Sequence, residues 1–248
     1  MSQPMLAVES LTKSFGGLTA INGVSFTAER GQFVGVIGPN GAGKTTLMNL
    51  VTGYLRPDAG TMRLEGQSLA GLSPFRICRL GVGRTFQIVR PFPEMSVEDN
   101  VITGALFATK PNVALKDARA AAREPLELTG LYAKRHVLAG SLTLGEKKKL
   151  ELARALATKP KLLLLDEVMG GVSRADVQDL MQVLRRIHAS GMTIVMIEHL
   201  VEVILALAQR VVVLNFGKKL VDGAPQYVVE HPDVVESYLG RPVEVHAS

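Results

Sequence analysis

The chain has 248 residues, a formal net charge of +5 and 47% apolar residues, enough for one large domain with a substantial buried core. Its single cysteine, Cys78, excludes internal disulfides and cysteine-based zinc sites, and we expect it to be a buried or half-buried hydrophobe. No apolar run approaches the ~20 residues that a membrane span needs. Residues 1–4 lack the basic flank and apolar core of a signal peptide, so a cytosolic protein is expected.

The densest basic run is Lys147–Lys149. Such a run can contact nucleic acid or acidic lipid, but three lysines more often form one solvated turn of a helix. We expect the solvated turn here.

The N-terminal part predicts a small antiparallel sheet followed by a buried strand. Strand-like pieces at residues 6–9 and 24–27 are separated by glycine-containing turns, and residues 60–66 are expected to add another strand. Residues 33–37 form a short apolar run that is typical of a buried parallel strand. A helix is predicted for residues 45–53, closed by Gly53.

The segment between that strand and that helix matches G-x-x-x-x-G-K-[ST], the phosphate-binding P-loop. Its glycines let the backbone curl so that successive N–H groups point at phosphate oxygens, and the helix N-terminus adds to the attraction. Lys44 is expected to reach the β- and γ-phosphates, and the Thr45 hydroxyl to ligate Mg²⁺. The predicted nucleotide-binding residues are Gly38, Pro39, Asn40, Gly41, Ala42, Gly43, Lys44, Thr45 and Thr46.

The middle of the chain reads as mainly helical. We expect helices over 74–80, over 112–139 and over 146–158, a helix start at Ser96–Asp99 and a strand over 82–87 ending in a polar residue. Pro125 is expected to begin a new helix or to kink the existing one. These elements predict a helical subdomain over about 72–158, inserted into an α/β core formed by about 5–71 and 159–240.

The last third predicts a parallel sheet. Residues 161–167 form an apolar strand that ends in Asp166 and Glu167, at the strand end where open α/β sheets bind ligands. A helix over about 175–190, capped at 173–176, and a strand over 193–197 ending at Glu198-His199 follow. A hairpin around 215–217 and two short helices starting at Pro225 and Pro232 complete the chain.

This order of motifs resembles the nucleotide-binding subunit of ABC transporters over residues 5–240. The resemblance implies an α/β fold with a P-loop NTPase (RecA-like) core, an N-terminal antiparallel β-subdomain and an inserted helical subdomain. It implies ATP and Mg²⁺ as cofactors and ATP hydrolysis coupled to transport as the activity.

The resemblance also assigns roles to single residues, each with a plainer alternative. Phe15 matches the aromatic that stacks on adenine, although alone it would be a core aromatic. Gln87 matches the Q-loop glutamine and His199 the switch histidine that can donate to the γ-phosphate; the alternatives are a polar strand end and a structural histidine. Asp166 matches the Mg²⁺-binding aspartate and Glu167 the catalytic glutamate, rather than a solvated carboxylate. The implied metal ligands are Thr45, Gln87 and Asp166, and the implied D-loop is Gly171–Ser173.

The signature segment departs from the family pattern. Residues 142–146, Leu-Thr-Leu-Gly-Glu, stand where the family has Leu-Ser-Gly-Gly-Gln. In the family this segment acts on the nucleotide of the facing subunit, so the resemblance implies that role in trans for Thr143, Leu144, Gly145 and Glu146. Leu144 puts a side chain where backbone would approach a phosphate, and Glu146 would add negative charge near the partner's nucleotide.

Two further departures replace prolines, with Val168 after the catalytic glutamate and Arg174 after the D-loop. The hypothesis is that this subunit pairs with a different ATPase and that the site using this signature is the weaker one.

Residues 83–87, 91–100 and 232–240 look like the ATPases of branched-chain amino acid importers. Those systems contain two different ATPases, two permeases and a periplasmic binding protein, which places the chain on the inner face of the plasma membrane. The helical subdomain would pass its movement to a permease that docks around 87–95. The ATPases of urea importers and of lipopolysaccharide export look similar, so the solute rests on analogy alone.

Two other classes of function compete with a transport motor. A soluble ABC ATPase acting on nucleic acid usually carries two such domains or large coiled-coil or zinc inserts, and this chain has neither. A P-loop kinase would lack the signature-like helix and His199. No nucleic-acid partner is therefore expected.

Overall fold

The computed structural model describes residues 3–106 and 113–239. The chain divides into two compact units, and each is described by itself. The first unit comprises Met1–Pro74 and Thr193–Ser248, and the second comprises Phe75–Met192.

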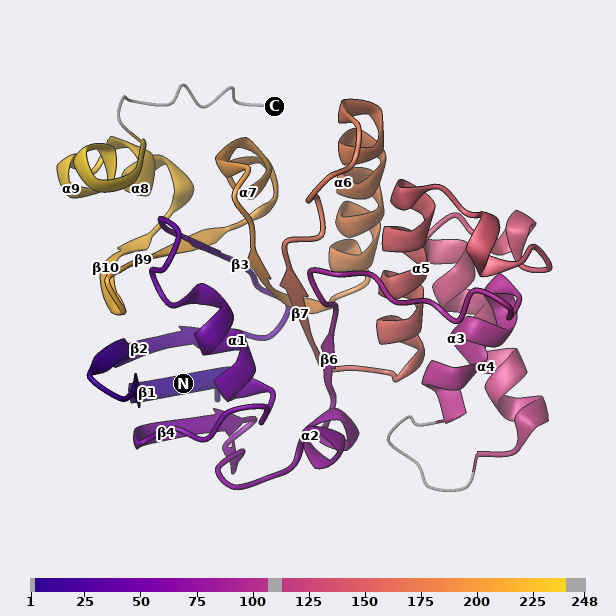
Figure 1. The fold of residues 1–248 in the computed structure, drawn as a ribbon, viewed down its shortest axis with the longest axis horizontal. Coiled ribbons are helices and arrows are strands. Elements are labelled where there is room, and N and C mark those ends of the chain that lie inside the picture. The colour runs from indigo at the N-terminus through magenta and orange to yellow at the C-terminus, as the bar shows by residue number, and fades with distance from the viewer. Residues whose placement is uncertain (1–2, 107–112, 240–248) are drawn as a thin grey trace. The chain divides into compact units, whose positions relative to one another are not determined.

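The first unit begins with the predicted antiparallel sheet. Its strands are β1 (Leu6–Phe15), β2 (Leu18–Ala28), β4 (Ala59–Leu64) and β5 (Gln67–Ser68). They are hydrogen-bonded in the order β2-β1-β4-β5, and the first three lie side by side in Figure 1. Leu6, Val8 and Leu11 of β1 are buried, so one face of this sheet packs into the core. The sheet is confirmed, with β1 and β2 longer than the sequence indicates.

The same unit holds a set of buried parallel strands. They are β3 (Phe33–Ile37), β8 (Thr193–Ile197) and β9 (Arg210–Asn215), with β10 (Lys218–Gly223) as an antiparallel hairpin partner of β9. β3 lies between β8 and β9 and is parallel to both. Every residue of β3 and of β8 is buried, as expected for strands covered on both faces.

The helices of the first unit are α1 (Lys44–Val51), α7 (Val201–Leu207), α8 (Pro225–Glu230) and α9 (Pro232–Val234), followed by a final turn over Val235–Leu239. α7 is absent from the sequence-based prediction, although Val203, Ile204 and Leu207 recur at helical spacing and are buried. It packs closely on β3, because a Cβ on Gly35 would lie 2.4 Å from Cγ2 of Ile204.

The second unit combines two parallel strands with helices. The strands are β6 (Val82–Arg84) and β7 (Leu162–Asp166), paired with Arg84 opposite Leu164. The helices are α2 (Pro74–Leu80), α3 (Val97–Leu106), α4 (Leu115–Leu128), α5 (Leu144–Ala157) and α6 (Arg174–Ala189), with short turns at Tyr132–Lys134 and Ala139–Ser141. Cys78 on α2 is half-buried, as predicted, and burial raises the pKa of its thiol.

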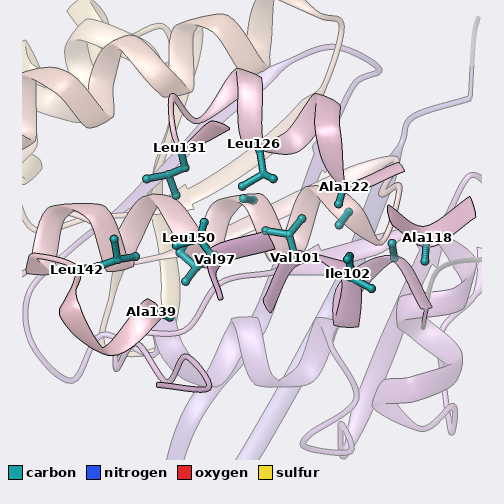
Figure 2. Close-up of a cluster of buried hydrophobic side chains, with 13 residues drawn as sticks. Val97, Val101, Ile102, Ala118, Ala122, Leu126, Leu131, Ala139, Leu142 and Leu150 are labelled. Carbon is teal, nitrogen blue, oxygen red and sulfur yellow. The ribbon is translucent and has the colours of Figure 1, made fainter. Parts of the chain in front are cut away.

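Three of these helices pack around one apolar core (Figure 2). α3 contributes Val97 and Val101, α4 contributes Leu126, and α5 contributes Leu150. The three helices thus share one core, which supports α5 along its length.

Two predicted elements end earlier than the sequence indicates. The predicted helix over 112–139 is α4, which starts at Leu115 and ends at Leu128, where Gly130 takes a left-handed φ of 73°; residue 112 itself lies outside the described residues. Pro125 does not begin a new helix, since α4 continues through it. The predicted strand over 82–87 ends at Arg84, so Gln87 lies in the loop beyond.

The helical subdomain predicted over about 72–158 lies almost entirely in the second unit, which also contains β7 and α6. The division of the chain into core and subdomain stays a prediction.

Candidate functional site

The P-loop follows β3 directly. Its backbone requires glycine at two positions where it passes close to the backbone of another segment. Gly38 has φ 146°, and a Cβ there would lie 2.0 Å from the carbonyl oxygen of Leu214. Gly43 has φ 100°, and its Cβ would lie 2.4 Å from the carbonyl oxygen of Ala20. Both neighbours are backbone atoms that cannot swing away, so any side chain would displace the loop. The tight curl predicted from the glycines is therefore present.

Lys44 is 5% exposed and lies across this loop. Its Nζ donates to the carbonyl oxygens of Gly38 at 2.6 Å and of Pro39 at 2.9 Å. Thr45, the next residue of α1, is exposed. The ammonium is thus held inside the loop at the N-terminus of a helix, where backbone N–H groups attract phosphate.

His199 lies at the same edge of the first unit's parallel strands as the P-loop. Ile197, at the end of β8, pairs with Val36 near the end of β3, so both strands point their carboxyl ends in one direction. His199 is exposed, and its backbone N–H donates to Oε2 of the buried Glu198 at 3.2 Å. Carboxyl ends of parallel strands are where such sheets bind ligands.

Phe15 ends β1 and is 46% exposed, so the alternative of a core aromatic is wrong. The Lys13 Nζ lies 5.6 Å from the centroid of its ring. A half-exposed ring beside a cation leaves a face on which a base can stack.

In the second unit, Asp166 ends β7 and is buried at 3% exposure. Nη2 of Arg84, which ends β6, donates to its Oδ2 at 2.8 Å, and the Asp166 backbone N–H donates to Oγ1 of Thr85 at 3.3 Å. Arg84 also lies over the ring of Phe86, at 4.9 Å from Cζ to the centroid. The arginine compensates the aspartate's charge inside the protein, a partner that sequence reasoning missed.

Gln87 and Glu167 meet beyond the ends of the same two strands. The Gln87 Nε2 donates to Oε2 of Glu167 at 2.6 Å, although the residues are 80 positions apart. Glu167 takes a left-handed φ of 50°, uncommon for a residue with a side chain and frequent at functional sites. The structure therefore brings together two of the residues that the sequence singled out.

Lys148 corrects the expectation that Lys147–Lys149 is a solvated turn. Lys148 is 3% exposed, and its Nζ donates to the carbonyl oxygens of Gln87 at 3.0 Å and of Glu167 at 3.3 Å. Lys149 pairs with Asp179 on α6. The missed signal was helical spacing, since Gly145 and Leu152 occupy the same buried face of α5 as Lys148.

Glu151 lies one turn after Lys148 and fixes the same loop. Its Oε1 accepts from the backbone N–H of Phe86 at 2.8 Å, while Oε2 is buried with no hydrogen-bond partner. Burial raises the pKa of this carboxyl to about 7, against the lowering effect of the Phe86 N–H bond. Sequence reasoning assigned Glu151 no role.

The signature segment caps α5. Thr143 is the N-cap, its Oγ1 accepts from the Glu146 N–H at 3.3 Å, and its own N–H donates to Oε2 of Glu146 at 3.0 Å. This reciprocal pair is a capping box, which needs a hydroxyl at the N-cap and a Glu or Gln three residues later. Leu144 is 45% exposed, and Gly145 is buried against Asp176, whose Oδ1 would lie 2.5 Å from an added Cβ.

The negative charge of the Glu146 carboxylate has a partner within this chain. It is paired with Lys134, and that bond, together with the capping bonds, lowers the pKa of the carboxyl. The expectation ignored Lys134 because it lies in a separate short turn, 12 residues earlier.

The D-loop ends in a second cap. Ser173 caps α6 in a capping box with Asp176, which makes Arg174 the first helical residue, a position that proline favours. Val168 is 1% exposed and packs in the core. Neither departure from the family pattern disturbs the local fold.

The donor types present suit Mg²⁺ rather than a closed protein metal cage. Among residues 3–106 and 113–239, no three His, Cys, Asp or Glu side chains gather in a way that would hold a metal ion. Mg²⁺ usually takes one or two protein oxygens and completes its shell with water and phosphate. The Asp166 carboxylate, the Thr45 hydroxyl and the Gln87 amide oxygen are hard donors of that kind.

The model of the ABC transporter family matches residues 21–170, more than half of the chain. The chain belongs to the ABC transporter family. It is an ATPase whose hydrolysis is coupled to transport, as the sequence predicted. In the part of the chain that the structure describes, no helix has the length and apolarity to cross a membrane.

Two curated relatives align over 97% of this chain and 100% of their own length. BraF of Pseudomonas aeruginosa, a high-affinity branched-chain amino acid transport ATP-binding protein, is 38% identical. LivG of Escherichia coli, which has the same description, is 37% identical.

The solved structures confirm the predicted fold. The ADP conformation of MJ1267, an ATP-binding cassette of an ABC transporter, is 30% identical, with a TM-score of 0.86 over 96% of this chain and 99% of that one. A nucleotide-free ATP-binding cassette from an ABC transporter is also 30% identical and matches with the same TM-score over 96% of this chain and 100% of that one.

Proposed function

We propose that this ATPase powers the import of branched-chain amino acids from the inner face of the plasma membrane. The solute rests on BraF and LivG, which match the chain over nearly its whole length. The role of Glu167 in hydrolysis rests on one observation, the 2.6 Å hydrogen bond from the Gln87 amide nitrogen to the Glu167 carboxylate. A glutamate held in this way is suited to orient and polarise an attacking water.

Each site residue then has a role. Lys44 and the N–H groups of the P-loop hold the phosphates of ATP, and Phe15 stacks on the adenine. Asp166, Thr45 and Gln87 would supply oxygen ligands for Mg²⁺, which neutralises charge on the phosphates when bound. Glu167 accepts a proton from the attacking water, and His199 donates a hydrogen bond to the γ-phosphate.

The permease is expected to dock over residues 87–95. Three large apolar side chains in and beside this stretch are exposed, Phe86 at 40%, Ile88 at 66% and Phe92 at 46%. Arg154 lies over the Phe92 ring at 5.0 Å. Apolar groups of this size on a surface loop favour a protein partner, and the loop runs directly on from Gln87, so a permease here would be linked to the hydrolytic residue.

The second ATPase is proposed to be a different chain, and the site served by this signature is proposed to be the weaker one. In support, the Leu144 side chain is exposed at the start of α5, where the family has glycine. Inactivating each of the two sites in turn within the assembled complex tests this point. Equal loss of turnover from either site would contradict it.

The experiment for the whole proposal is co-purification followed by solute assay. The tagged chain is expressed with its native neighbours, the membranes are solubilised gently, and the bound proteins are identified. We expect permease subunits, a second ATPase, and a periplasmic binding protein selective for leucine, isoleucine or valine. A binding protein selective for urea, or export partners for lipopolysaccharide, would overturn the solute. If the tagged chain instead co-purified with nucleic acid and bound it with an affinity that falls as salt rises, the transport function would be overturned.

A further inference from the structure

We propose that Lys148 is a positioning residue for hydrolysis, holding the backbones of Gln87 and Glu167 in the register that lets their side chains bond. The proposal rests on the catalytic role given to Glu167 above. It goes beyond that role, since the Lys148 ammonium contacts the backbones of Gln87 and Glu167 and would act on hydrolysis only through these two residues.

The contacts of its ammonium carry the inference. Lys148 Nζ donates to the carbonyl oxygen of Gln87 at 3.0 Å and to that of Glu167 at 3.3 Å. Those two residues follow different strands, and the same two are joined by the 2.6 Å bond between their side chains. One cation therefore fixes the relative position of both backbones, and the side-chain pair depends on that position.

The burial of the lysine shows that this arrangement is built rather than incidental. At 3% exposure the lysine has given up most of its hydration, a cost that hydrogen bonds to carbonyl oxygens offset only when the geometry is good. Glu151, one turn later, accepts a hydrogen bond from the Phe86 N–H at 2.8 Å. Helix α5 therefore bonds to this loop at two adjacent residues, Phe86 and Gln87.

The helix that carries these contacts also begins with the signature. Thr143 caps α5, and Lys148 lies just over one turn beyond it. A rigid helix moves as one body, so a shift at its capped end is transmitted to the Gln87–Glu167 pair. Lys148 thereby links the segment that faces a partner's nucleotide to the residues that hydrolyse this chain's own.

The test uses the full-length chain in its assembled transporter and compares Lys148→Met with Lys149→Met. Methionine keeps the length and removes the donors. Lys149 undergoes the same change one residue on, where its ammonium pairs with Asp179 instead. We expect Lys148→Met to lower kcat by about 10- to 100-fold, because displacement of about 1 Å at a reacting group costs that much. ATP affinity should stay within about twofold of wild type, and Lys149→Met should match wild type in both measurements.

Two further variants separate positioning from general structural damage. Lys148→Arg keeps a donor that reaches both carbonyls, and we expect it to recover most of the lost kcat. In a Glu167→Gln background, Lys148→Met should cause little further loss, because residues that act as one unit are not additive. If Lys148 had only a structural role, Lys148→Met would lower kcat by the same factor in the wild-type and in the Glu167→Gln protein.

Lys148→Gln covers the case in which the methionine variant does not fold. Its side chain is too short to span both carbonyls, so kcat should fall while ATP affinity is kept. Wild-type kcat in the folded Met or Gln variant would overturn the proposal, as would a parallel loss of ATP affinity and kcat. A fully active Glu167→Gln would instead overturn the catalytic assignment on which the proposal rests.

Discussion

The amide nitrogen of Gln87 lies 2.6 Å from the carboxylate oxygen Oε2 of Glu167, in a hydrogen bond between residues 80 positions apart. The bond fixes the orientation of the carboxylate, and it depends on the length of the glutamate side chain.

Glu167→Asp keeps the charge but withdraws the carboxylate by one methylene. We expect kcat to fall about 10²-fold with ATP affinity preserved, because the water would no longer be oriented within reach of the base. Steady-state hydrolysis and equilibrium ATP binding measure the two effects. Glu124→Asp, the same change at an exposed position of α4, is the control. A Glu167→Asp variant with wild-type kcat would remove the pairing from the mechanism.

The Arg84–Asp166 pair should couple strongly in stability. Both side chains are buried, at 7% and 4% exposure, and Nη2 to Oδ2 is 2.8 Å. Removing one partner of such a pair typically costs about 3–5 kcal/mol, because a charge is left buried alone. We therefore expect Arg84→Met and Asp166→Asn each to lower the free energy of unfolding, and the double variant to lose much less than the sum of the two.

Denaturant unfolding of all four proteins gives the coupling energy. The control cycle is Arg123–Glu127, an exposed pair on α4 with side chains 67% and 49% exposed, which should couple only weakly because solvent screens it. Additive losses at Arg84 and Asp166 would contradict the pairing.

Glu151 should make the stability of the protein fall as pH rises between about 4.5 and 7. Burial raises the pKa of its carboxyl from 4.5 to about 7, so in this window the folded protein binds the proton that the unfolded chain has released. Lys148 and Arg154 nearby oppose the shift, and Asp166 reinforces it. The free energy of unfolding should fall by about 3 kcal/mol across this window, and the full decrease is reached above pH 7.

Glu151→Gln removes the titration, so unfolding free energies of the variant should vary less across this window than those of wild type. The exposed Glu124→Gln should leave the wild-type profile unchanged. A Glu151→Gln profile as steep as wild type would place the titrating group elsewhere.

The P-loop allows a matched comparison of two glycines. Gly41 and Gly43 both have positive φ, at 79° and 100°, but an added Cβ meets nothing within 4 Å at Gly41 and a backbone oxygen at 2.4 Å at Gly43. Gly41→Ala should therefore cost about 1–2 kcal/mol from backbone strain alone. Gly43→Ala should cost clearly more. Equal losses of unfolding free energy would show that the loop moves to accept the side chain.

Local patterns made the P-loop, the helix cap at Ser173 and the carboxylates at the end of β7 predictable. The roles of Lys44, Ser173 and Asp166 depend on residues next to them in the sequence, so a motif and its spacing are enough to predict these roles. Helix α7 was equally within reach, because Val203, Ile204 and Leu207 have helical spacing. The strand over 82–87 was overextended because a loop held by α5 continues the apolar pattern of β6.

The long-range polar contacts could not be predicted in the same way. From the sequence alone, Lys148 is expected to be a solvated lysine, and only the structure shows the carbonyl oxygens that surround it. The sequence likewise gives no sign that Lys134 pairs with Glu146. In both cases a charged residue was judged by its neighbours in sequence, although its environment is set by residues farther along the chain.

The most direct test of the account is ATP-driven uptake of a labelled branched-chain amino acid by the assembled transporter, compared between wild type and Glu167→Gln. We predict ATP-dependent uptake by the wild type, and none by the variant although it still assembles and binds ATP. Uptake that persists in the variant would contradict the role of Glu167, and a wild-type complex that binds and hydrolyses ATP without moving such a solute would contradict the transport assignment.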